Sequence, residues 1–176
     1  MNYLLENPKG IDVEVQAIQN KLYKSLESSW LELDGYGRVQ KAISEDGANP
    51  EFFISGVDYL DIYPGEKSKF FFLKGDSHIE ERYTGIVTSE LGLYVFVNIA
   101  KLNTAERYDE KALIDVMTVI ESTRFKPEKI QGVEAFLSDF KKMYDSSEHN
   151  PGNIDLQPFH VFKVKGYIEY KLKKTC

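Results

Sequence analysis

The sequence has only one cysteine, Cys176, which is also its last residue. A single thiol cannot form an intramolecular disulfide or a multi-cysteine metal site, so both are excluded. Long apolar runs are also lacking, and none approaches the roughly 20 residues that a membrane-spanning helix needs. Residues 1–8 lack the basic segment and the long apolar segment of a secretory signal peptide, so we expect a protein that stays where it is made.

Basic residues do not exceed acidic ones: 22 Lys and Arg stand against 28 Asp and Glu, a formal net charge of -6. Binding to a phosphate backbone needs a basic excess, so we do not expect the chain to grip nucleic acid. The short basic end with Lys171, Lys173 and Lys174 is typical of edge protection on a strand. Hydrophobic content of 42% with 28% charged residues predicts one globular domain over residues 1–176.

Sequence motifs for catalysis or cofactor binding are also lacking. Neither GxxxxGK[ST] nor GxGxxG occurs, and the histidines do not have the spacing of a metal site. A metal bound by His78 beside Glu80 and Glu81 is the least unfavourable metal hypothesis. Ser77 follows Gly-Asp as in one class of esterases, but it lies mid-chain without a later Asp-x-x-His pair, so a plain turn is the simpler prediction. We therefore expect no catalytic residue, no metal and no cofactor.

Apolar residues recur at spacings of three and four in three segments, which predicts three amphipathic helices. The first spans about residues 11–31, the second begins at Asp109 and ends near residue 121, and the third spans about residues 130–144. Asp109 and Glu110 suit the positive end of the second helix dipole. Residues 1–9 precede the first helix as an arm.

Extended segments are predicted at residues 38–43, 51–55, 58–63, 69–73, 82–87 and 92–99, with turns at 74–77 and 89–90. Residues 92–99 are apolar on both faces, which only a strand covered on two sides tolerates, so they form the centre of the sheet. Polar loops are expected at 44–50 and 145–158. Residues 159–173 form a C-terminal strand bent at Gly166, although a hairpin there explains the change of phase equally well.

These elements predict an α+β fold: a mostly antiparallel sheet of about four to six strands, with the N-terminal helix and two further helices packed on it. The layout resembles that of tail terminator and related neck or tail-completion proteins of tailed bacteriophages. The resemblance is carried by the helix start at Gly10-Ile11-Asp12, the strand over residues 93–99, the helix entry at 105–110 and the closing strand at 159–162. It covers most of the chain and contains no catalytic fingerprint.

The resemblance implies a structural virion protein, assembled in the host bacterial cytoplasm, that forms a ring at the tail-neck junction. Such a ring, commonly a hexamer, caps the tail tube, joins it to the head connector and lets DNA pass through its lumen. Its partners would be copies of itself, tail-tube proteins and neck or connector proteins, with no membrane involved. A closed ring needs two different complementary faces on each subunit.

Contacts with these partners are expected at the sheet edges and at the loops 44–50 and 145–158. Phe70-Phe71-Phe72 shows phenylalanine to both faces of its strand, which suggests burial by the fold and by a neighbouring subunit. The candidate contact residues are Asp46, Asn49, Phe70, Phe72, His149, Asn150, Asn153, Lys171 and Lys173.

Two other functions remain open from the sequence. A non-catalytic adaptor or immunity-type binding protein shares the lack of catalytic motifs, but would be a monomer or form a one-to-one complex. A small hydrolase would need Ser77 or a histidine in a pocket with a shifted pKa.

Overall fold

The computed structural model describes residues 1–44, 47–55, 58–62, 65–81, 85–102, 107–143 and 158–172. These residues form an α+β fold, as predicted, but its sheet has eight strands rather than four to six. The helices are α1 (Ile11–Leu26), α2 (Tyr108–Ile120) and α3 (Val133–Met143), with a short 3-10 turn η1 (Ile99–Lys101). The strands are β1 (Asn2–Tyr3), β2 (Leu33–Ser44), β3 (Gly47–Ser55), β4 (Asp58–Asp61), β5 (Ser68–Glu81), β6 (Ile86–Asn98), β7 (Phe125–Gln131) and β8 (Phe159–Lys171).

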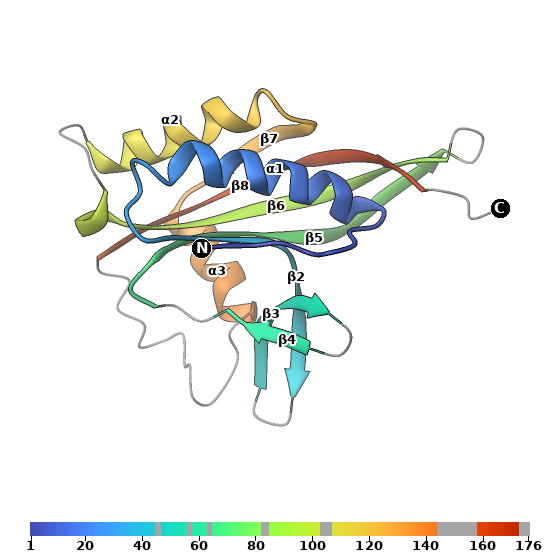
Figure 1. Ribbon diagram of the computed structural model, residues 1–176, viewed down its shortest axis with the longest axis horizontal. Helices are drawn as coiled ribbons and strands as arrows, with labels where there is room; N and C mark the ends of the chain where they lie inside the picture. The colour runs from blue at the N-terminus through green and yellow to red at the C-terminus, as the bar shows by residue number, and fades with distance from the viewer. Residues whose placement is uncertain are drawn as a thin grey trace.

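The main sheet has the order β4-β3-β2-β5-β6-β8-β7 (Figure 1). Strand β1 adds to β2 beside this path. Only the β1–β2 and β2–β5 pairs within the described residues are parallel. The other neighbours are antiparallel. Short connections join the β2–β3, β3–β4 and β5–β6 pairs, whereas β8 pairs with β6 and β7 after longer connections that contain helices. The expected arm at residues 1–9 is thus partly a strand of the sheet.

Strand β6 is an interior strand, flanked by β5 and β8, and all its residues from 91 to 98 are buried. Leu93, Val95 and Val97 point into one core, whereas Tyr94 and Phe96 point into the other. This confirms the prediction that the run is apolar on both faces because both faces are covered.

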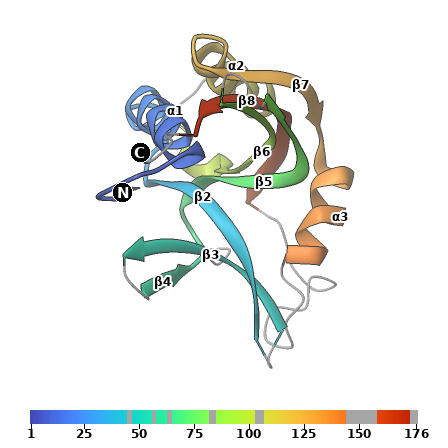
Figure 2. The same ribbon diagram turned by 90° about the vertical axis from the view of Figure 1, so that its right-hand side faces the viewer.

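Helices cover the two faces of the sheet unequally. Helices α1 and α2 lie on one face and α3 lies on the other (Figure 2). On the first face, Leu22 and Val116 pack in the larger core with strand residues from β5, β6 and β8. On the second face, Phe136 of α3 sets its ring edge-on against Tyr94 and Phe96, with centroids 5.8 and 4.9 Å away. None of the described helices is long and apolar enough to cross a membrane.

Several predicted boundaries were wrong. The expected turns at residues 74–77 and 89–90 lie inside β5 and β6, which remain paired across an irregularity between Lys74 and His78. Polar residues there do not reverse the chain, and Ser89 is buried within β6. Most of the expected loop at 44–50 belongs to the β2–β3 ladder, and α1 ends at Leu26 rather than near residue 31.

The C-terminal segment is one strand, as preferred from the sequence, but Gly166 is not a bulge. Pairing between β6 and β8 runs without a shift through Gly166, and the irregularity lies in β7 between Pro127 and Lys129. A Cβ atom at Gly166 would lie 2.3 Å from the carbonyl oxygen of Lys126. Glycine is needed there because β7 approaches too closely for any side chain.

Substitution of Gly166 by alanine should therefore lower the free energy of unfolding by about 3 kcal/mol, since a backbone carbonyl has to move. Denaturant unfolding measures this loss. The matched control is Gly132→Ala, where a Cβ meets nothing within 4 Å, and its cost should stay below about 1 kcal/mol. Equal losses for the two variants would contradict the close approach of β7.

Candidate partner-binding surfaces

The structure places the predicted contact residues in different environments. Phe70 and Phe72 are 1% and 0% exposed and belong to the larger core. They therefore do not form the subunit surface that the sequence predicted. Their face of β5 is covered by the chain's own helices. Lys171 is exposed at the end of β8, and Asn49 is paired with Ala42 in the β2–β3 ladder. Five predicted contacts lie outside the described residues: Asp46, His149, Asn150, Asn153 and Lys173.

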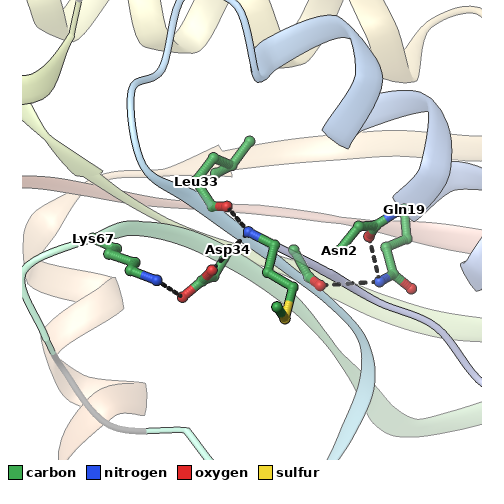
Figure 3. Close-up of polar contacts among 7 residues, drawn as sticks. Asn2, Gln19, Leu33, Asp34 and Lys67 are labelled. Carbon is green, nitrogen blue, oxygen red and sulfur yellow. Dashed lines mark hydrogen bonds and ion pairs between the residues drawn. The ribbon is translucent and has the colours of Figure 1, made fainter.

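Asp34 at the start of β2 ties the N-terminal arm to the sheet (Figure 3). Its carboxylate accepts a hydrogen bond from the Met1 amine at 2.8 Å and lies 3.6 Å from the Lys67 amine. The Met1 amine also donates to the Leu33 carbonyl. These bonds hold β1 in register along β2, so the arm is a fixed edge of the fold.

Gln19 of α1 fastens the same arm from the helix side. Its amide nitrogen donates to Asn2 Oδ1 at 2.8 Å (Figure 3). It also donates to the Tyr3 carbonyl at 2.6 Å and to the Gly35 carbonyl at 3.1 Å. The side chain is fully buried, and hydrogen bonds in such a place strongly fix position because their loss leaves buried polar groups unpaired. This polar group therefore has a structural role.

Lys69 on β5 is only 5% exposed. Burial lowers its pKa from 10.5 to about 8, and the neighbouring Lys67 charge acts in the same direction, while Asp34 opposes both. A lowered lysine pKa means that the fold disfavours the charged form.

The free energy of unfolding should therefore rise by about 2 kcal/mol between pH 8 and pH 10. In this range the unfolded chain holds the Lys69 proton more tightly than the folded chain, so raising the pH removes a penalty of folding. Above pH 10 the raised pKa values of buried Tyr36 and Tyr94 act in the opposite direction. Urea unfolding at several pH values tests this.

Lys69→Met should abolish this rise in the free energy of unfolding. Lys67→Met, at a side chain that is 51% exposed, should keep it. A flat profile in the unmodified chain would show that Lys69 carries no such penalty.

A second polar cluster lies under α3. Asp139 of α3 accepts hydrogen bonds from Tyr94 at 3.1 Å and from Lys163 at 2.6 Å. The Lys163 amine also lies 4.8 Å from the centroid of the Tyr94 ring. Burial, aided by the Asp139 charge, raises the pKa of Tyr94, so its hydroxyl stays a donor. The cluster fixes α3 on the sheet beside its apolar anchor Phe136.

Asp139→Ala should lower the free energy of unfolding by about 2 kcal/mol, because Lys163 and Tyr94 keep their burial and lose their acceptor. The exposed Glu134 on the same helix provides the control, and Glu134→Ala should change stability by less than about 0.5 kcal/mol. Thermal unfolding followed by circular dichroism compares the two. Similar effects at both positions would rule out the cluster as the anchor of α3.

A groove of about 1050 Å³ lies where the N-terminal arm meets the end of β8. Its lining includes Lys171, one of the predicted contacts, together with Lys9 and Arg124. Glu6 and Glu14 also line it, and Arg124 is paired with Glu14 at 2.6 Å. The groove therefore presents charges of both signs, so its lining does not favour a ligand of either charge.

The β3–β4 hairpin is the more distinctive surface. It stands off the side of the sheet that faces away from α1 and α2 (Figure 1, Figure 2). Its inner face is anchored: Phe52 and the following Ile62 are each 1% exposed and join the smaller core. Leu60 pairs with Phe52 and packs against the same core. A buried inner face gives the hairpin a fixed position.

The outer face of this hairpin exposes aromatic groups. Phe53 and Tyr59 lie opposite each other and form an edge-to-face pair with centroids 5.4 Å apart. They are 37% and 45% exposed, and the adjacent Ile54 is 41% exposed. Exposed aromatic residues grouped on one element are typical of interaction surfaces.

The segment that contains this hairpin, residues 42–66, carries a charge equal to the net charge of the whole chain. Residues 42–66 contain no Lys, Arg or His, and the remaining 22 acidic residues balance the 22 basic ones. The six carboxylates of the segment are Glu45, Asp46, Glu51, Asp58, Asp61 and Glu66. The lack of basic residues is visible in the sequence and could have identified this surface from the sequence alone. The Phe53–Tyr59 pair could not have been found in that way, because it depends on the register between β3 and β4.

The hydrolase hypothesis needs Ser77 or a histidine in a pocket, and the strand register separates Ser77 from His160. His78 pairs with Ser89 and His160 pairs with Val97, which places Ser77 and His160 about 25 Å apart along β6. His160 instead lies beside the Tyr108 ring, where burial lowers its pKa despite the nearby Asp109. The described residues contain no group of three or more His, Cys, Asp or Glu placed to hold a metal ion.

Comparison of the chain with protein-family models, with curated proteins and with solved structures finds no significant match.

Proposed function

We propose that this chain is a structural protein that acts by docking onto other protein subunits, and that its assembly is the ring at the tail-neck junction of a tailed bacteriophage. The observation that carries the docking role is the β3–β4 hairpin. Its inner face is buried in the core, and its outer face exposes the Phe53–Tyr59 pair among carboxylates. A rigid element with an aromatic surface meets a partner without a large entropic cost of ordering.

A second edge of the sheet supports assembly into a ring. Strand β7 lies at the opposite end of the sheet order from β4 and exposes Lys126, Lys129 and Ile130. A ring subunit needs two different faces that point to two neighbours. The two edges differ in charge and composition, which fits such head-to-tail contacts.

The assignment to a phage tail follows the resemblance of the layout to tail terminator and neck proteins. Under this proposal the partners are copies of the chain, the tail tube and the head connector, and DNA passes through the lumen. The net charge of -6 fits a lumen that repels DNA rather than holding it.

A non-catalytic adaptor or immunity-type protein is the second candidate. The observation that favours it is the concentration of the net charge on one segment, residues 42–66. One dominant surface suits a one-to-one complex with a single basic partner better than a closed ring of identical subunits.

Native mass spectrometry and light scattering over a range of protein concentrations, followed by negative-stain imaging, separate the two candidates. The ring proposal expects a closed oligomer, commonly of six copies as the resemblance implies. Assembly should persist on dilution to low micromolar concentration, as expected for an interface of standard size. A strict monomer at the highest concentration contradicts the ring and leaves the adaptor.

A further inference from the structure

We propose that the outer edge of β4 binds an extended, lysine- or arginine-rich segment of a partner protein, which adds to the sheet as a further strand. This inference rests on the proposed docking function and identifies the chemistry of one partner. Strand addition uses main-chain hydrogen bonds for affinity and alternate side chains for specificity. Three features of the hairpin point to it.

The first feature is the open edge. Among the residues that the structure describes, β4 pairs with β3 and with no other strand. The other end of the sheet, β7, carries Lys126, Pro127 and Lys129, and lysine and proline on an edge strand block further pairing. Strand β4, Asp-Tyr-Leu-Asp, has neither, and the two aspartates at its ends would attract a basic strand rather than repel it.

The second feature is the alternation of side chains on the hairpin. Leu60 and Phe52 face the core, whereas Tyr59 and Phe53 face outward. An added strand would extend this outer face and place alternate side chains beside the Tyr59 ring. A lysine or arginine there gains a cation–π contact in addition to its ionic ones.

The third feature is the charge of the segment. Residues 42–66 contain six carboxylates and no Lys, Arg or His. Glu51 of β3 and Asp61 of β4 lie directly opposite each other in the ladder. This concentration of negative charge favours a basic partner over an acidic or a neutral one.

The length of β4 limits the contact. Four residues of strand, Asp58–Asp61, span about 13 Å. An added segment of similar length gives a weak, salt-sensitive interaction that avidity in an oligomer would strengthen.

The probe for the experiment is a fluorescein-labelled peptide in which lysine alternates with threonine, and fluorescence anisotropy measures its binding to the full chain. The same peptide with glutamate in place of lysine should not bind. The triple variant E51Q/D58N/D61N should weaken binding about tenfold or more. The matched control E121Q/E128Q/E134Q removes the same charge at exposed positions away from the hairpin and should keep binding within about twofold.

Two N-methylated peptides test whether the peptide adds as a strand. Each carries methyl groups on alternate backbone nitrogens, so each blocks hydrogen bonding along one of its two edges. One pattern should abolish binding, and the other should leave it unchanged, because only one edge of the peptide faces β4. Equal binding of both shows a purely ionic attraction and overturns the inference, as does equal weakening by the two triple variants.

Measuring the oligomeric state in the same samples keeps the two proposals apart. A closed ring that forms equally well in the E51Q/D58N/D61N variant does not use the β4 edge for its contacts, and failure of this ring to bind the lysine peptide rejects the β4 site and keeps the proposed assembly. A monomer that binds it in the expected pattern rejects the ring and keeps the site. Circular dichroism of each triple variant verifies that the fold is intact, and the control variant reports on the loss of charge alone.

Discussion

The burial of β6 on both of its faces is the constraint on which the rest of the structure depends. Residues 91–98 have no solvent-facing side, so one layer of helices has to cover each face of the sheet. Helices α1 and α2 supply the larger core, and α3 with the base of the β3–β4 hairpin supplies the smaller one. The polar clusters at Asp34 and Asp139 then fix the arm and α3 in place.

In this arrangement the inner face of the β3–β4 hairpin is buried in the smaller core, and its outer face stays exposed. Phe52 and Ile62 pack in the smaller core and anchor the hairpin, so the exposed Phe53 and Tyr59 are held in a fixed position. A surface with this composition lowers the cost of binding because little has to be ordered on contact. The proposed docking role therefore follows from the fact that the smaller core buries only the inner face of the hairpin.

Local patterns predicted much of the fold and little of the candidate site. Helical periodicity found α1, α2 and α3, and the apolar run at residues 92–99 found the interior strand. The turn predicted at Ser89 was wrong because two consecutive polar residues inside a long strand look like a turn when read locally. Phe70-Phe71-Phe72 predicted burial by the fold and by a neighbouring subunit, because the sequence does not say which helix covers which face of the strand.

The sequence by itself determined the three helices, the interior strand and the concentration of carboxylates in residues 42–66, since each depends on neighbours along the chain. Only the tertiary structure decided that β2 pairs in parallel with β5, that Lys69 is buried, and that Phe53 and Tyr59 share an outer face. These features depend on which distant segments meet. That choice is made by the packing of the whole chain, because a strand can satisfy its hydrogen bonds with many alternative partners.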